Sequence, residues 1–155
     1  MELAVGSGEL RLTSVDPGVQ PFIDCRYLEE PWDRERMRER VRIALKLMEH
    51  EAFRNIVDGL ISPTEQDLAS DDALDSWMME NVWIGQHLSG TCKMGPSSDP
   101  MAVVDQYGRV HGMEGLRVAD ASVMPDVIRA NTNATTIMIG ERVADWIAAE
   151  LAQAT

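Results

Sequence analysis

The stretch from residue 87 to residue 130 restricts the possible folds of this chain more than any other part of the sequence. Glycines and prolines interrupt every helical period in it, and these two residue types at close spacing favour turns. Its first part contains Gly90, Gly95 and Pro96, and Gly108 follows. We therefore predict a functional loop at residues 87–96, short strands at 102–105 and 116–119, and irregular chain from 122 to 130.

Amphipathic helices are predicted ahead of this stretch. A first helix opens at Pro31, with Asp33 as its predicted N-cap. Its apolar residues recur at helical spacing on one face, at Met37, Val41, Leu45 and Met48. A second helix begins at Asp71 and reaches about Val82, with a buried stripe of Leu74, Trp77 and Met78.

Two strands are predicted ahead of the first helix. Leu10 and Leu12 alternate with polar residues, which is the period of a half-buried strand. A turn follows at residues 16–18, and residues 22–28 are again extended. Because two strands alone are only marginally stable in water, we expect this pair to complete a larger sheet supplied by residues outside this chain.

Length, charge and composition exclude several classes of function. The 155 residues, 45% of them hydrophobic, suffice for one compact domain with a core. A formal net charge of -12 repels nucleic acid and anionic membrane surfaces. The sequence contains no apolar run of the ~18 to 20 residues that span a bilayer. No basic segment followed by an apolar core marks a secretory signal at its start.

The cysteines indicate a reducing compartment. Cys25 and Cys92 lie far apart and form neither a CxxC pair nor a disulfide framework, so we expect reduced thiols and a cytoplasmic location. Cys92 lies close to His87, and such a pair can indicate a thiolate nucleophile or a metal site. No second pair of ligands completes a tetrahedral site, so we expect Cys92 to be a small buried residue and no metal to be bound.

The histidines differ in their sequence surroundings. His50 lies between two glutamates in a helical pattern, His111 precedes Gly112 in a turn, and His87 heads the glycine-bearing loop. Because imidazole titrates near neutral pH, a histidine held on a loop is a candidate general base. A hydrogen-bonded structural histidine is the alternative interpretation of His87.

Small polar residues precede the last predicted helix, which runs from residue 134 to residue 151. Residues 131–136 read Asn-Thr-Asn-Ala-Thr-Thr. The backbone N–H groups and the positive dipole end of such a helix start can receive an electron-rich ligand atom. The alternative is that Asn133 only caps the helix, which contributes about 1 kcal/mol of stability.

Together, these segments resemble the C-terminal signature of the glucose-methanol-choline (GMC) oxidoreductases, most closely their choline-dehydrogenase-like branch. Four motifs carry the resemblance in family-like order and spacing. They are residues 87–95, residues 104–105 with 108–112, residues 115–125 and residues 131–142. The two predicted strands and the start of the first helix look, more loosely, like the end of the family's substrate domain.

The resemblance implies oxidation of an alcohol to a carbonyl compound, with FAD as hydride acceptor. The family's catalytic histidine falls on His87, which would accept the proton of the substrate hydroxyl. Its second active-site position falls on Asn133, whose amide can hydrogen-bond the alcohol oxygen but cannot act as a base. The positions implied to contact the flavin are Asp120, Ala121, Asn133, Ala134 and Thr135.

A full family member also has a nucleotide-binding half with a strand, a G-x-G-x-x-G turn and a helix. The nearest match, residues 6–11, lacks the third glycine and precedes a strand, so the chain alone should bind FAD poorly. The implied partners are a small alcohol, a missing N-terminal FAD-binding half and an electron acceptor. The sequence does not determine which alcohol is oxidised. It also leaves the electron acceptor open, and therefore whether the enzyme is an oxidase or a dehydrogenase. A truncated gene, an engineered piece or a split enzyme would explain the missing half.

We therefore expect an α/β fold, in part α+β, that is the C-terminal part of an FAD-binding fold with a piece of the substrate-domain sheet and helices. Residues 1–83 would belong to the substrate-binding region, and residues 84–155 would complete the flavin site. The alternative to a fragment of a catalytic flavoenzyme is a non-catalytic interaction domain whose acidic surface docks a partner, or one subunit of a split enzyme.

Overall fold

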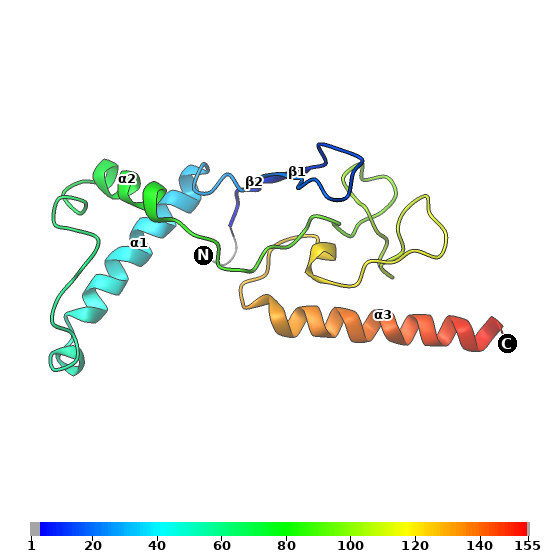
Figure 1. Ribbon diagram of the computed structural model, residues 1–155. Coiled ribbons are helices and arrows are strands. Elements are labelled where there is room, and N and C mark those ends of the chain that lie inside the picture. Colours follow the sequence, from blue (N-terminus) through cyan, green and yellow to red (C-terminus); the bar gives the residue numbers. More distant parts are fainter. Residues whose placement is uncertain (1–3, 155) are drawn as a thin grey trace. The chain divides into compact units, whose positions relative to one another are not determined.

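The computed structural model describes residues 4–154 and consists of helices with one small sheet (Figure 1). The described residues form two compact units, the first ending at Trp83 and the second beginning at Ile84. Helices combined with a two-stranded sheet agree with the α/β class that the sequence predicts. What each unit contributes to an enzyme stays a prediction.

The sheet of the first unit joins β1 (Glu9–Arg11) to β2 (Phe22–Asp24) in antiparallel register, with Leu10 opposite Ile23. The prediction of extended chain as far as residue 28 was wrong. Arg26 and Leu28 have φ angles of 45° and 58°, in the left-handed region, so the chain turns after β2. This turn places the side chain of Leu28 in the core of the unit.

The first helix, α1 (Pro31–Met48), begins as the sequence predicts, but its cap differs. Proline occupies the first helical position, where its missing N–H costs nothing, so the N-cap residue is Glu30 and not Asp33. Asp33 lies inside the first turn and is only 3% exposed. Its carboxylate accepts hydrogen bonds from the backbone N–H groups of Val5, at 3.0 Å, and Gly6, at 2.8 Å. Asp33 therefore fastens the preceding segment to α1.

Helix α2 (Asp71–Asn81) packs against α1, and the short 3₁₀ helix η1 (Glu51–Phe53) lies between them in sequence. Leu74 and Met78 of the predicted stripe are buried, while Trp77 is half-buried. The Arg38 guanidinium on α1 donates to both carboxylate oxygens of Asp75 on α2, at 2.7 and 2.8 Å. Apolar contact and this ion pair together hold the two helices.

The second unit contains fewer regular elements than predicted. Neither residues 102–105 nor residues 116–119 form strands; the described chain has only isolated bridges there, such as Val104 with Val110 and Arg109 with Arg117. Closely spaced glycines turn the chain before a ladder can extend. A 3₁₀ helix, η2 (Ala121–Val123), lies at the start of the stretch predicted to be irregular. The core includes Val104, which is fully buried, with Val123, Met124 and Val143.

Gly108 illustrates why this unit needs glycine at particular positions. Its φ angle is 74°, and a Cβ atom there would lie 2.6 Å from the carbonyl oxygen of Val118. The two residues approach closely because the N–H of Val118 donates to the carbonyl of Gly108, at 2.9 Å. Any side chain at this position would displace the segment that leads to η2.

The last helix, α3 (Thr132–Ala154), is the longest element (Figure 1). The prediction of Asn133 as its N-cap was wrong, because the helix begins at Thr132 and Asn133 lies within the first turn. No acidic side chain occupies that turn. Towards the other end, the Glu150 carboxylate pairs with Arg109 and Arg117, which ties α3 to the loops of the same unit.

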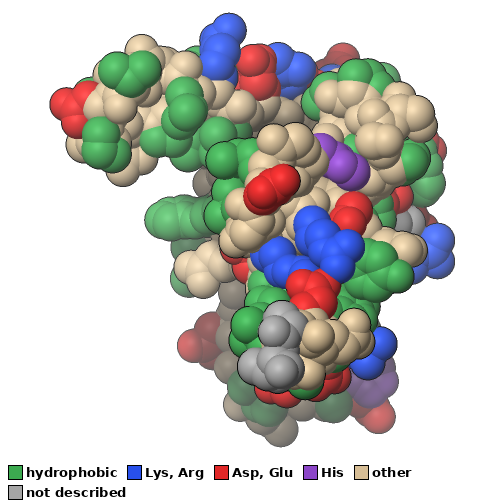
Figure 2. Space-filling model, turned by 90° about the vertical axis from the view of Figure 1, so that its right-hand side faces the viewer, with side chains coloured by type: hydrophobic (Ala, Val, Ile, Leu, Met, Phe, Trp, Pro, Cys, Tyr) green, Lys and Arg blue, Asp and Glu red, His purple; other side chains and the backbone are tan. Residues whose placement is uncertain are grey.

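Many apolar side chains remain on the surface of this chain. Figure 2 shows hydrophobic side chains exposed between acidic and basic ones. On α3, Ile137, Met138 and Leu151 are all more than half exposed, at 58%, 51% and 64%. Among residues 4–154, no helix combines the length and the apolar character needed to cross a bilayer.

Candidate functional site

His87 lies at the head of the loop that the sequence singles out, and its ring is partly buried. The preceding residue, Gln86, has a φ angle of 57°, in the left-handed region that residues with a side chain adopt rarely. His87 Nδ1 lies 3.0 Å from the hydroxyl oxygen of Thr132. In the described part of the chain, His87 Nε2 forms no hydrogen bond. One ring nitrogen is therefore held and the other is available to a ligand.

This hydrogen bond brings together two segments that lie far apart in sequence. Thr132 is the first residue of α3, so the imidazole sits at the N-terminal end of that helix. Asn133 and Ala134 follow in the first turn and are exposed, and Thr135 is half-buried. Three of the residues predicted to contact substrate or flavin therefore lie directly after the residue that holds His87.

Asp120 and Ala121 approach the same loop from another side. The N–H of Gly90 donates to the carbonyl of Ala121, at 3.3 Å, and Cys92 and Met94 continue this pairing with Ser122 and Val123. The Asp120 carboxylate accepts from both the N–H and the hydroxyl of Ser122, at 2.8 and 2.5 Å, and so caps η2. Sequence reasoning did not anticipate this structural use of the Asp120 side chain.

The far end of the His87 loop is anchored by a charged pair. Lys93 Nζ lies 2.8 Å from a carboxylate oxygen of Asp99, and the hydrogen bond from Lys93 holds the pKa of Asp99 below its ordinary value. The carbonyl of Lys93 also accepts from the N–H of Val103, at 2.8 Å. Hydrogen bonds on two sides thus limit the positions that the loop can adopt.

The other candidates serve structural purposes. His50 Nδ1 accepts from the N–H of Ala52 and caps η1, and His111 Nε2 lies 3.0 Å from the carbonyl oxygen of Gly95. Cys92 is a free thiol and is half-buried rather than fully buried. Among residues 4–154, no cluster of His, Cys, Asp and Glu side chains could hold a metal ion.

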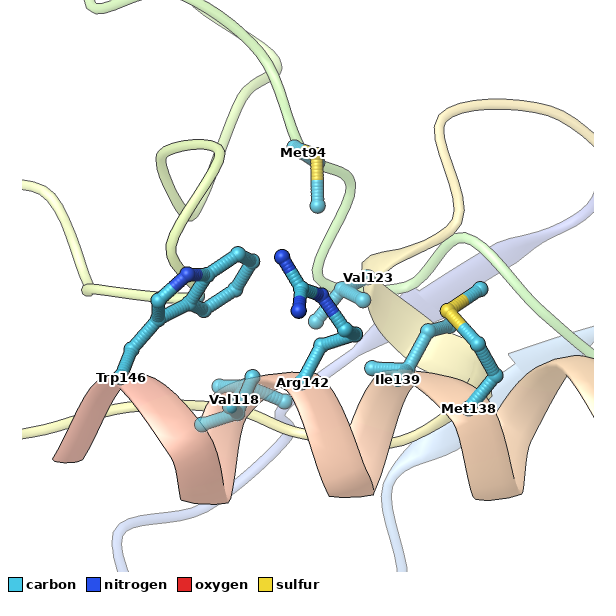
Figure 3. A pocket seen from close by; sticks show the side chains of 9 residues that line it. Met94, Val118, Val123, Met138, Ile139, Arg142 and Trp146 are labelled. Carbon is cyan, nitrogen blue, oxygen red and sulfur yellow. The ribbon is translucent and has the colours of Figure 1, made fainter. Parts of the chain in front are cut away.

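A cavity of about 250 Å³ lies beside the part of α3 that runs from Met138 to Trp146 (Figure 3). Its lining is apolar except for Arg142. Figure 3 shows the side chains of Arg142 and Trp146 extending from α3 toward Met94. The Trp146 ring also packs edge-on against Tyr107, with ring centroids 5.1 Å apart. This cavity is separate from the polar groups at the start of α3.

The arrangement at the start of α3 suits proton transfer. An imidazole that is fixed through one nitrogen can accept a proton at the other. The adjacent helix start offers backbone N–H groups and a positive dipole end, with no acidic side chain in its first turn to compete for them. Sequence reasoning predicted His87 and Asn133 as site residues but did not single out Thr132, which directly precedes Asn133.

Comparison with known proteins assigns the chain to a family. The sequence profile of the GMC oxidoreductases matches residues 4–140. The oxygen-dependent choline dehydrogenase of Cronobacter sakazakii is 45% identical over 140 residues, which cover 90% of this chain and 24% of that protein. The corresponding enzyme of Klebsiella pneumoniae is 46% identical, again over 140 residues, and 25% of it is covered. The chain thus spans about a quarter of the length of the curated relatives it matches.

Solved structures agree with this result. A formate oxidase of Aspergillus oryzae RIB40, crystallised to study the effect of a mutation on FAD modification, has a TM-score of 0.84 at 33% identity. The match covers 95% of this chain and 25% of the oxidase. A fungal aryl-alcohol oxidase has a TM-score of 0.77 at 32% identity and covers 93% of this chain, which in turn spans 24% of that oxidase. The chain therefore belongs to the GMC oxidoreductase family and corresponds to its C-terminal region.

Proposed function

We propose that this chain supplies the C-terminal part of an FAD-dependent enzyme that oxidises a small alcohol to a carbonyl compound. When bound, FAD supplies the acceptor for the hydride that leaves the alcohol carbon. The observation that carries the proposal is the hydrogen bond between His87 and Thr132, because it sets His87 beside Asn133 at the start of α3. The names of the curated relatives, which are choline dehydrogenases, support an alcohol as substrate.

His87 acts as the general base in this proposal. Its Nε2 accepts the hydroxyl proton of the alcohol as the C–H bond breaks, so that one proton passes to the imidazole and one hydride leaves the carbon. The absence of any hydrogen bond to Nε2 within the described residues fits this role, because the atom is available to the substrate. In this proposal Nδ1 keeps its hydrogen bond to the Thr132 hydroxyl, which is 3.0 Å away, during the step.

Asn133 orients the alcohol. Its side-chain amide is exposed in the first turn of α3 and can donate a hydrogen bond to the substrate oxygen, but it cannot take a proton at neutral pH. The proposed division of labour is therefore that Asn133 binds the oxygen and His87 takes the proton.

The residues at the start of α3 fit the electron-rich edge of a flavin. Ala134 has a small side chain, Thr135 offers a backbone N–H near the helix end, and no acidic residue in this turn opposes negative charge. Asp120 and Ala121 would complete the contact. Since the Asp120 carboxylate already accepts from Ser122, Asp120 would contribute mainly through its backbone.

The remaining parts of the flavin site would come from an N-terminal FAD-binding portion. The proposal rests on the covered length, about a quarter of each relative, and on the apolar side chains of Ile137 and Leu151 that α3 leaves exposed. A cytoplasmic location is part of the proposal, because Cys25 and Cys92 are free thiols. The electron acceptor would be chosen by residues of the complete protein.

The same exposed apolar side chains also favour a second candidate, in which the chain is a separate subunit or a non-catalytic interaction domain. An interaction domain differs from the first candidate in its dependence on flavin, whereas a subunit of a split flavoenzyme does not. An interaction domain would bind its partner without FAD, whereas a catalytic part would restore flavin chemistry to the portion that it completes.

A hybrid enzyme tests the proposal directly. It consists of the portion of the Cronobacter sakazakii choline dehydrogenase that precedes the matched region, followed by this chain. We expect the hybrid enzyme to bind FAD and its absorbance to bleach on addition of choline without oxygen, whereas the N-terminal portion alone does neither. Co-expression of the two pieces as separate chains tests the split-subunit form. A hybrid enzyme that binds FAD but is not reduced by choline or by other small alcohols would refute the catalytic proposal.

A further inference from the structure

Thr132 is the one side chain of the described residues that forms a hydrogen bond with His87. Its hydroxyl oxygen lies 3.0 Å from Nδ1, and the residue is only 8% exposed. We infer that Thr132 is a positioning residue, which selects the tautomer of His87 that can accept a proton and fixes the direction of its ring. This inference rests on the proposed function, since it concerns how His87 is prepared to act as a base.

The proposed role of His87 as a base requires one direction of donation. When Nδ1 carries the hydrogen and donates it to the Thr132 oxygen, Nε2 presents a lone pair to the substrate. In the opposite arrangement the hydroxyl donates to Nδ1, the hydrogen resides on Nε2, and no proton can be accepted there. After proton transfer both nitrogens carry hydrogens, and the Thr132 oxygen still accepts from Nδ1. The Thr132 hydroxyl oxygen can therefore accept the hydrogen bond from Nδ1 both before and after proton transfer, without a change of its position.

The backbone that carries this hydroxyl is held in place. Threonine is branched at Cβ, which leaves two common values for its first side-chain torsion in a helix. The carbonyl of Thr132 accepts a hydrogen bond from the hydroxyl of Thr136 one turn later, at 2.8 Å. Burial and this bond hold Thr132 at the helix start, directly before Asn133. The same backbone therefore positions the proton acceptor through Thr132 and the alcohol-binding amide through Asn133.

A merely structural role predicts different behaviour. In that case the Thr132 hydroxyl only provides a hydrogen bond to the partly buried imidazole. Loss of the hydroxyl would then lower stability or FAD content, and its effect on the rate of flavin reduction would be the same with and without His87. Two substitutions separate the roles. Thr132→Val keeps the shape of the side chain but removes the hydroxyl, and Thr132→Ser keeps the hydroxyl but removes the methyl group.

The test measures anaerobic flavin reduction by choline in the hybrid enzyme, for variants matched in FAD content. We expect Thr132→Val to lower the limiting rate constant by about 10- to 100-fold, the loss that follows removal of the hydrogen-bond partner of a metal-ligating histidine, which has a comparable orienting role. Thr132→Ser should stay within about threefold of the unchanged hybrid enzyme, because it retains the oxygen. In a His87→Gln background, Thr132→Val should have no further effect. Should Thr132→Val lose FAD, Thr132→Ala takes its place in the same comparison.

A spectroscopic signature supports the kinetics. In enzyme labelled with ¹⁵N in histidine, the His87 resonances, identified by their loss in His87→Gln, should show hydrogen on Nδ1 and change toward Nε2 protonation in Thr132→Val. The inference is overturned if Thr132→Val and Thr132→Ser have equal rates, or if Thr132→Val slows the His87→Gln enzyme as much as the parent. Failure of the proposed function is distinguishable, because His87→Gln would then reduce its flavin at the parental rate.

Discussion

Replacing Gly108 by alanine should destabilise the second unit strongly. The φ angle of 74° forces an L residue into the left-handed region, which costs roughly 1 to 2 kcal/mol. In addition, the new Cβ would lie 2.6 Å from the backbone oxygen of Val118, so that segment must move. Overpacking of this kind adds about 1 to 3 kcal/mol. We therefore expect Gly108→Ala to lower the free energy of unfolding by about 3 kcal/mol.

Gly112 provides a matched control. Its φ angle is 76°, nearly the same, but no atom lies within 4 Å of the position of a Cβ. Gly112→Ala should therefore cost only about 1 kcal/mol, and the difference of about 2 kcal/mol isolates the close approach at Gly108. Urea unfolding, followed by the fluorescence of Trp146 with the other tryptophans replaced by phenylalanine, measures the free energy of unfolding of both variants. The comparison requires that the two variants have equal m-values. Equal losses in the two variants would refute the reasoning.

Two further predictions concern other elements. Ser70→Ala should lower the free energy of unfolding of the first unit by about 1 kcal/mol, because the Ser70 hydroxyl accepts a hydrogen bond from the N–H of Ala73 at the start of α2. Urea unfolding measures this loss, with Ser76→Ala in the same helix as the comparison variant. Hydrogen bonds from Arg117, and then from Arg109, hold the pKa of Glu150 below its ordinary value of 4.5. The stabilisation that this pKa shift supplies is complete above pH 4.5 and is lost as the pH falls through the lower pKa that Glu150 has in the folded protein. Glu150→Gln should therefore be less stable than the parent at neutral pH and equally stable in acid. Thermal unfolding measured across this pH range checks this.

The helices were predictable from the sequence because their apolar residues recur at helical spacing. Helix α2 begins and ends almost where the pattern of Leu74, Trp77 and Met78 indicates. The N-cap of α1 and the first residue of α3 were harder to predict from the sequence. A proline at the first helical position moved the cap from Asp33 to Glu30, and α3 begins before Asn133 because Thr132 is already helical. Cap position depends on backbone torsions that composition does not determine.

The strands of the second unit and the partner of His87 were beyond sequence reasoning for a different reason. A ladder needs a neighbouring strand, and the glycine turns around Gly108 and Gly112 leave only isolated bridges. The His87 contact joins residues separated by 45 positions, which no local period reports. By contrast, His87 and Asn133 could be singled out in advance because each lies within a motif of the family.

The rate of flavin reduction in the hybrid enzyme with and without His87 tests the central claim most directly. His87→Gln should lower the limiting rate constant for reduction by choline by about 100- to 10,000-fold at unchanged FAD content, the usual contribution of a positioned general base. His111→Gln is the matched control, because His111 lies in the same unit but pairs with the Gly95 carbonyl, and it should leave the rate unchanged. A His87→Gln enzyme that binds FAD fully and is reduced within about threefold of the parental rate would contradict the account.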